Sequence, residues 1–333
     1  MPDLTRLDIV MPVWNEKDNV RAALESIEES ASQAGVETRL IVIDDGSAPE
    51  HAVFLDELAG EGRIHLIRQE NSGRFLARQR GMDEVSSDYV LLMDARVRLY
   101  PDTLASLRAM VQQGSHPVWS AHVDLLNAES PWTSFWFGIT CVWWREYFQN
   151  PRRSVLTEEN FDRYPKGTGA FFARSDLMRV AMEAFTTRFE GHAYSSDDTG
   201  LLRYFARNGG INLTPQIRCG YYGKDSFKGW ARQSFYRGTT FIDGYLPQDA
   251  NPAYYLAAAC AAVGVGVAGM IAAPRAMAVG AVGAAVSAGV GARWCGATPH
   301  QAASVTALCL PFGVVFGAGL MRGLLMATRQ FAR

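Results

Sequence analysis

A pattern that repeats through the first hundred residues limits the possible folds more than any other feature of this sequence. Short apolar runs alternate with stretches whose apolar residues recur at helical spacing, and most of the runs end in polar or acidic residues. The runs are residues 7–13, 40–43, 64–67 and 89–93. Strands that alternate with helices in this way build a parallel, doubly wound sheet, so the pattern predicts an α/β domain.

The fourth run is the centre of this prediction. Val90-Leu91-Leu92-Met93 is typical of a strand that is buried on both faces, and Asp94 follows it directly. Ligands of open α/β sheets bind at the edge formed by the carboxyl ends of the strands. We therefore expect Asp94 at that edge, beside the polar residues that end the earlier strands.

The chain changes composition after residue 253. Residues 254–273, 276–292 and 302–321 carry no charge, and twenty helical residues span about 30 Å, the thickness of a bilayer's hydrocarbon core. These runs predict a membrane anchor of two or three helices. Three spans would put the arginines of the C-terminal tail opposite the first domain, against the positive-inside tendency, whereas a re-entrant or interfacial third segment would not. The number of spans stays open at this point.

Three parts follow from these patterns: a catalytic domain over residues 1–226, an amphipathic interfacial segment over 227–250 and a membrane region over 251–333. The middle segment mixes large aromatic residues with arginines, as helices at a membrane surface do. Residues 131–147 are also unusually aromatic. They fit either a core or subunit contact, or a helix that faces lipid or an acceptor.

Charge and cysteine content exclude several classes of protein. From Tyr254 onward there are five arginines and no Asp or Glu, so the first 253 residues hold 34 acidic and 27 basic residues. This balance argues against a nucleic-acid-binding surface. Five cysteines without a Cys-x-x-Cys pair indicate neither a disulfide framework nor a zinc site. The polar N-terminus does not resemble a signal peptide, so we expect the first domain in the cytoplasm.

The order of the motifs resembles glycosyltransferase family 2. Residues 11–16 precede a helix, residues 42–47 end the second run, and Asn71-Ser72-Gly73, Ala77-Arg78 and residues 91–94 follow in the family's order. The resemblance covers about residues 7 to 240. It implies a GT-A fold, which is Rossmann-like, and transfer of a sugar from a nucleotide-diphosphate sugar with inversion of the anomeric centre.

The resemblance also implies a donor site at the sheet edge. Its implied residues are Pro12, Asn15, Glu16, Asp44, Asp45, Arg74, Arg78, Asp94 and Arg96. Carboxylates suit ribose hydroxyls because they accept two hydrogen bonds, and the arginines suit the diphosphate. Asp44 and Asp45 also fit a turn before Gly46-Ser47, and arginines are common on exposed helix surfaces.

Arg96 departs from the family's pattern. The family has Asp-x-Asp here, and its last carboxylate binds a divalent ion that bridges the diphosphate. An arginine binds no metal, but it can offset the charge of the leaving group. The sequence leaves two readings open: Mg²⁺ or Mn²⁺ is held by Asp94, with His192 or the diphosphate as further ligands, or the chain needs less metal than its relatives.

Asp197 and Asp198 occupy the place of the family's acidic pair. An inverting transfer needs a base that takes the proton of the acceptor hydroxyl, and the resemblance implies Asp198 for this role. Helix capping is the alternative for both residues. The residues implied on the acceptor side are Gly167, Gly169, Trp230, Gln233 and Arg237. The last three belong to a variant of the family's Gln-x-x-Arg-Trp element, and the variant favours a single transfer over processive synthesis.

The resemblance and the anchor together predict a multi-pass glycosyltransferase of the cell membrane. It would move one sugar, by hexosyltransferase-type chemistry, to a lipid-linked or glycan acceptor in the synthesis of cell-envelope polysaccharide. Membrane lipids would be further partners. Two alternatives are a non-catalytic nucleotide-binding membrane scaffold with a degenerate Asp-x-Asp motif and a nucleotidyltransferase. The second would want a glycine-rich, basic loop after the first strand, where this chain has Trp14-Asn15-Glu16. The sequence does not predict the sugar, the nucleotide, the acceptor or the oligomeric state.

Overall fold

The computed structural model describes residues 3–114, 116–167 and 169–331. The chain divides into two compact units. The first comprises Met1–Leu126, Asn150–Thr186 and Asp197–Tyr222, and the second comprises Asn127–Gln149, Thr187–Ser196 and Gly223–Arg333. We describe each unit by itself.

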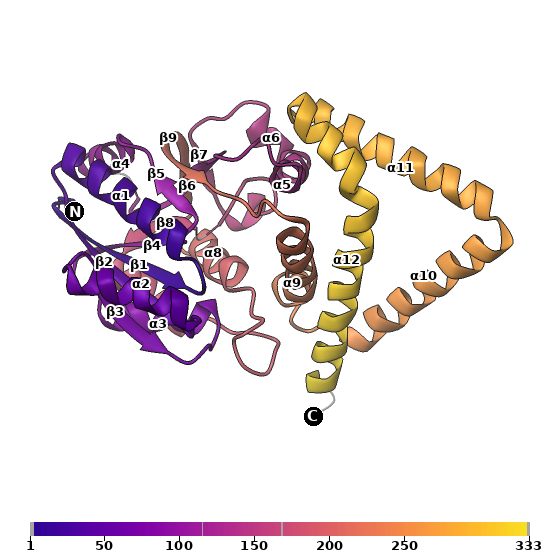
Figure 1. Cartoon of the computed structure of the whole chain (residues 1–333), viewed down its shortest axis with the longest axis horizontal. Helices are drawn as coiled ribbons and strands as arrows, with labels where there is room; N and C mark the ends of the chain where they lie inside the picture. The colour runs from indigo at the N-terminus through magenta and orange to yellow at the C-terminus, as the bar shows by residue number, and fades with distance from the viewer. Residues whose placement is uncertain (1–2, 115, 168, 332–333) are drawn as a thin grey trace. The chain divides into compact units, whose positions relative to one another are not determined.

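The first unit is an α/β domain (Figure 1). Its strands are β1 (Arg6–Val13), β2 (Glu37–Asp45), β3 (His65–Gln69), β4 (Tyr89–Met93), β5 (Val97–Leu99), β6 (Val118–Leu125), β7 (Ser154–Leu156), β8 (Ala170–Arg174) and β9 (Ile211–Tyr221). Its helices are α1 (Lys17–Ala34), α2 (Pro49–Gly60), α3 (Arg74–Asp83), α4 (Thr103–Gln112), α7 (Ser175–Glu183) and α8 (Asp197–Arg207), with a 3₁₀ turn, η1 (Glu158–Asn160).

The sheet is mixed rather than parallel throughout. In the described part of the chain its strands run in the order β3-β2-β1-β4-β8-β6-β9-β5, with β7 beside β9. The predicted parallel arrangement is correct for β3, β2, β1 and β4. Beyond them the sheet is mixed: β8 runs antiparallel to β4 and to β6, β9 runs parallel to β6, and β5 runs antiparallel to β9. Parallel neighbours need a crossover that returns the chain to the same end of the sheet, and the regular strand–helix alternation stops after β4.

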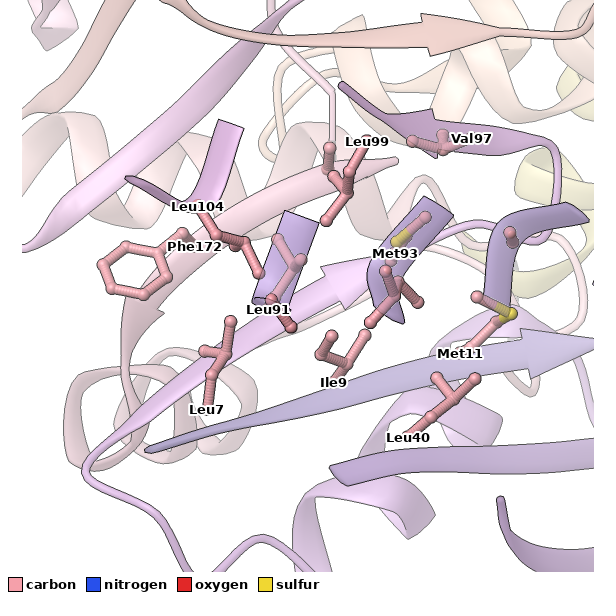
Figure 2. Packing of buried hydrophobic residues seen from close by; sticks show 14 of the residues in the cluster. Leu7, Ile9, Met11, Leu40, Leu91, Met93, Val97, Leu99, Leu104 and Phe172 are labelled. Carbon is pink, nitrogen blue, oxygen red and sulfur yellow. The ribbon is translucent and has the colours of Figure 1, made fainter. Parts of the chain in front are cut away.

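Alternate residues of the central strands fill the core. Leu7, Ile9 and Met11 of β1 and Leu91 and Met93 of β4 belong to one buried cluster. Ile9 pairs directly with Leu91, and Figure 2 shows these side chains converging from the two neighbouring strands. Strand side chains alternate between faces with a period of two, so this spacing places one whole face of each strand in the core.

Asp8 fixes the start of β1, and its side chain lies on the face of the strand opposite to that of Leu7 and Ile9. Its side chain is buried and accepts hydrogen bonds from Arg39 Nε (3.0 Å) and from the Ser86 and Ser87 amides (2.6 and 3.0 Å). Burial alone would raise the pKa of Asp8, but the Arg39 guanidinium and these amides outweigh burial and hold the pKa below its ordinary value. The ionised carboxylate therefore ties β1 to β2 and to the loop before β4.

The second unit is helical in its described part. Its helices are α5 (Pro131–Trp143), α6 (Arg145–Phe148), α9 (Phe227–Tyr245), α10 (Pro252–Ala272), α11 (Pro274–Trp294) and α12 (Pro299–Phe331). By length and composition, α10, α11 and α12 could each cross a membrane. The third apolar run lies within one continuous helix of 33 residues that includes Pro311. The aromatic segment predicted over residues 131–147 is divided at Trp144 into α5 and α6.

Glycines bring the backbones of α9 and α12 into close contact. A Cβ atom added at Gly319 would lie 2.1 Å from the Phe235 carbonyl oxygen, and one at Gly238 would lie 2.3 Å from the Phe316 carbonyl oxygen. Gly323 makes a third such approach, to the Thr239 carbonyl oxygen. Small residues permit close packing of this kind between apolar helices. In Figure 1, α9 lies along α12.

Candidate active site

The loop after β1 is tied to the loop after β2 by Asn15. Its backbone N–H donates to Ser47 Oγ (3.0 Å), and its side-chain Oδ1 accepts from the Ala48 N–H (2.8 Å). Asn15 has a φ of 56°, a left-handed conformation that Asn adopts more readily than most residues. Just before it, Pro12 lies within β1 opposite Ile43 of β2. Both predicted donor residues therefore sit where two parallel strands end side by side.

Asp44 and Asp45 hold turns at the end of β2. Asp44 accepts from the Ser47 N–H (2.9 Å) and from Arg68 Nε (3.3 Å). Both oxygens of Asp45 are also engaged, and the carboxylate is buried. Its donors are Gln69 Nε2 (2.8 Å) and the amides of Ser72 (2.9 Å) and Gly73 (3.1 Å). Asp44 thus holds the turn at Gly46-Ser47, as the turn-forming interpretation expected. Asp45 instead fixes the turn that leads into α3, and contact of either residue with a donor stays a prediction.

Arg78 of α3 is the centre of a cluster of charges from three distant segments. Its side chain is fully buried, and it donates from Nη2 to Asp94 Oδ1 (2.8 Å) and from Nη1 to Asp197 Oδ2 (2.7 Å) and Asp198 Oδ1 (3.1 Å). Burial alone would lower the pKa of Arg78, but the negative charges of Asp197 and Asp94 outweigh burial and raise it. Arg78 is therefore a permanent cation between β4 and α8.

Arg74 completes this group, which we call the carboxylate–arginine cluster: Arg74, Arg78, Asp94, Asp197 and Asp198. Arg74 Nη2 lies 2.8 Å from Asp197 Oδ1 and 3.0 Å from Asp198 Oδ2. Its Nη1 lies 3.9 Å from Asp94 Oδ2. Only 2% of the Asp197 side chain is exposed, against 34% of Asp198, so Asp198 is the member of the pair that a substrate can reach.

Arg96 forms a second group with Glu16. Its Nε donates to Glu16 Oε1 (2.8 Å), and its Nη1 donates to the Tyr222 carbonyl oxygen (3.2 Å). Asn19 bridges this pair to Arg98, because Asn19 Nδ2 donates to Glu16 Oε2 (2.7 Å) and Arg98 Nη2 donates to Asn19 Oδ1 (3.1 Å). Asn19 and Arg98 were not predicted as site residues. Arg96 lies in the turn before β5 and Arg98 within that strand, so no simple periodicity in the sequence marks them as a pair.

Gly169 supports the backbone of Asp94. Its carbonyl oxygen accepts from the Asp94 N–H (2.8 Å), and a Cβ atom added to it would lie 3.5 Å from Asp94 Oδ2. The Gly167 carbonyl oxygen accepts from Ser120 Oγ (3.4 Å). Thr168, between them in the predicted glycine loop, lies outside the described residues. The structure thus places Gly169, but not Gly167, directly against a member of the cluster.

The other residues predicted on the acceptor side belong to the second unit. Trp230 is buried, with its ring 5.5 Å from that of Phe135, so it packs in an aromatic core. The Arg237 guanidinium lies 4.3 Å from the centre of the Trp136 ring. Gln233 is half-buried on α9. His192, considered as a metal ligand, is also in this unit. Roles of these residues toward an acceptor or a metal stay predictions.

The side chains at the sheet edge do not fit a divalent cation held mainly by the protein. Asp94 Oδ1 already accepts from Arg78, and Arg96 stands where the family's Asp-x-Asp pattern has its second carboxylate. In the part of the chain that the structure describes, no three His, Cys, Asp or Glu side chains form a group that could hold a metal ion. Cations of this class prefer oxygen ligands, and guanidinium groups repel them.

The sequence is similar to curated proteins that are named as glycosyltransferases or sugar transferases. The sequence is 30% identical over 114 residues to undecaprenyl-phosphate 4-deoxy-4-formamido-L-arabinose transferase of Proteus mirabilis, a match that covers 33% of this chain and 35% of that protein. It is 28% identical over 126 residues to the uncharacterized glycosyltransferase YibD of Escherichia coli, covering 37% and 36%. These matches span about a third of the length of the curated relatives.

Two solved structures were also found to be similar. The crystal structure of Staphylococcus aureus TarS 1–349 gives a TM-score of 0.47 at 13% identity, covering 73% of this chain and 67% of that one. The same protein in complex with UDP gives the same TM-score at 14% identity and the same coverage.

The family itself is identified by the sequence. Residues 8–177, more than half of the chain, match the family described as Glycosyl transferase family 2. This stretch contains most of β1, the strands β2 to β4, the helix α3 with both arginines of the cluster, and Asp94. The predicted family and its GT-A class of mixed α/β fold are thereby confirmed: the chain belongs to glycosyl transferase family 2.

Proposed function

We propose that this protein transfers a single sugar from a nucleotide-diphosphate sugar to a lipid-linked or glycan acceptor at a membrane, with inversion at the anomeric carbon. The observation that carries the proposal is the carboxylate–arginine cluster. It joins Asp94 at the end of β4, two arginines of α3 and the acidic pair that begins α8. Within the matched family, the cluster combines anion-binding side chains with two partly exposed carboxylates, those of Asp94 and Asp198.

The proposed reaction is a single displacement. The acceptor oxygen attacks the anomeric carbon of the donor, the bond from that carbon to the diphosphate oxygen breaks, and the nucleoside diphosphate leaves with the bonding electrons. Asp198 takes the proton of the acceptor hydroxyl, because it is the accessible member of the acidic pair. Asp197, buried between both arginines, would keep them in place. If the acceptor is an ionised phosphate, it needs no base and Asp198 matters much less.

A lipid-linked acceptor is supported by two observations. Three helices of the second unit are long and apolar enough to cross a membrane, and the relative from Proteus mirabilis is named for transfer to undecaprenyl phosphate. We infer that α10, α11 and α12 hold the protein in the cell membrane, where such acceptors are found, and that the catalytic unit faces the cytoplasm, where nucleotide sugars are made. This places the reaction in cell-envelope glycan synthesis.

The test uses the full-length protein in detergent. A panel of nucleotide sugars is screened for release of nucleoside diphosphate, with and without membrane lipid extract as acceptor, and Asp198→Asn serves as the matched variant. Release from one donor that depends on the extract, and is lost in the variant with a hydroxyl acceptor, is the expected result. Nucleotide binding without release from any donor would instead support the non-catalytic scaffold, and failure of nucleotides to bind would refute both functions.

A further inference from the structure

The two charged groups at the sheet edge differ in their balance of charge. In the carboxylate–arginine cluster two guanidinium groups face three carboxylates. In the group around Glu16 the balance is reversed, because Arg96 bonds this one carboxylate directly and Arg98 is linked to it through Asn19. The two groups therefore have opposite net charges, and the two arginines of the positive group follow Asp94 in the chain.

Arg98 is the source of the excess charge. It donates to the carbonyl oxygens of Ala95 and Val97 and to Asn19 Oδ1, all neutral groups. Across residues 3–114, 116–167 and 169–331 it makes no ion pair. Burial, followed by the positive charge of Arg96, lowers the pKa of Arg98. A cation held only by neutral oxygens lowers its energy when an anion comes near.

The guanidinium of Arg96 is held in a fixed position. Its Nε is bonded to Glu16, its Nη1 donates to the Tyr222 carbonyl, and its own carbonyl oxygen accepts from the Tyr222 N–H (2.9 Å). These hydrogen bonds hold the guanidinium in place. Because 19% of the side chain is exposed, a ligand can still reach it. Charges preorganised in this way stabilise a developing anion without reorganising during the reaction.

We propose that Arg96, reinforced by Arg98, supplies the positive charge that stabilises the leaving nucleoside diphosphate, so that donor binding and sugar transfer need no divalent cation. This inference rests on the proposed function and departs from the Asp-x-Asp chemistry that the family resemblance implied. It agrees with the surroundings of Asp94. The Asp94 carboxylate already accepts a hydrogen bond from Arg78, and the residue two positions later is an arginine rather than a second aspartate. Guanidinium groups bind phosphate oxygens through paired N–H donors, and they therefore serve as a direct substitute.

The experiment measures binding of nucleoside diphosphates to the full-length protein by calorimetry, in the presence of a chelator or of Mn²⁺. Nucleoside diphosphates with each of the common bases are tested to identify the one that binds. For the wild-type protein we expect the same Kd in both conditions, within about twofold. Arg96→Ala should weaken binding about 10- to 100-fold, the usual effect of removing hydrogen bonds to a charged group, and Mn²⁺ should not restore it.

Two further variants sharpen the test. Arg96→Asp creates the missing second carboxylate, so it should bind weakly in chelator and recover with Mn²⁺. Arg108→Ala is the matched control, because it removes a guanidinium of α4 that pairs with Asp3 at the same 2.8 Å and belongs to neither charged group. It should bind as the wild type does. Thermal unfolding of every variant checks that it is folded.

The outcomes distinguish whether donor binding depends on a divalent cation or on Arg96. Wild-type binding that is lost in chelator and restored by Mn²⁺ would overturn the cation-independent mechanism alone. Unchanged binding by Arg96→Ala would also overturn it, because the charge would then come from elsewhere. If no nucleoside diphosphate binds in either condition, the proposed glycosyltransferase function fails together with the inference.

Discussion

Replacing Arg78 with Met should destabilise the first unit strongly. Met has a comparable length, but it removes the fully buried guanidinium that contacts Asp94, Asp197 and Asp198, and of the two arginines of the cluster only the partly exposed Arg74 remains. Breaking a buried ion pair by removing one partner costs about 3–5 kcal/mol, because the remaining charge is buried without compensation. For a domain of this size, that corresponds to a fall in Tm of about 6–20 °C.

The assay is thermal unfolding of the detergent-solubilised protein, followed by intrinsic fluorescence. Arg63→Met is the matched control, because its guanidinium pairs with Glu28 at 2.8 Å but both side chains are partly exposed. A surface pair contributes at most about 1 kcal/mol, so this variant should stay close to the wild type.

A double variant tests the cause of the loss. If Arg78 acts by compensating Asp197, then Arg78→Met combined with Asp197→Asn should lose less stability than the sum of the two single changes. A fall in Tm no larger than that of Arg63→Met would refute the reasoning, and so would strict additivity in the double variant.

Three further predictions concern other parts of the chain. Asp198→Asn should reduce transfer to a hydroxyl acceptor by a factor of about 10² to 10⁴ while nucleotide binding persists; unimpaired turnover would remove Asp198 from the base role. Gly319→Val should lower Tm, since its Cβ would lie 2.1 Å from a backbone oxygen of α9, whereas Gly313→Val, with nothing within 4 Å, should not; equal effects would contradict the close packing. The folded pKa of Asp8 is lowered, so its stabilising contribution is complete above the unfolded value of about 3.9 and is lost as pH falls through the lower folded value. Tm measured between neutral and acidic pH should fall less steeply in Asp8→Asn, and parallel curves would contradict this assignment.

The sequence predicted the part of the fold that follows from local patterns. The runs that became β1 to β4 were apolar, short and separated by helical spacing, and this alone implies parallel neighbours. The antiparallel placement of β8 was beyond reach, because a strand's direction in the sheet depends on where a long connection returns. Residues 94–170 contain no regular alternation that would indicate this path.

The site was predicted as a set of residues but not as a set of contacts. Asp94, Arg78 and Asp198 lie more than a hundred residues apart at the extremes, and the family motifs placed them at one sheet edge. The sharing of one buried guanidinium among three carboxylates depends on side-chain geometry, which no spacing encodes. Arg98 was missed for a different reason: a charged residue in a short strand is ordinarily exposed, and only its neutral partners mark it as unusual.

The glycine contact between α9 and α12 has a consequence for the order in which the protein matures. Helix α12 is synthesised after α9, α10 and α11, so the face of α9 that carries Gly238 has no partner until the chain has passed through two other apolar helices. Domains generally fold as units during synthesis, with the earlier ones first. The sheet of the first unit can therefore form early, whereas α9 reaches its final packing only after α12 has been made.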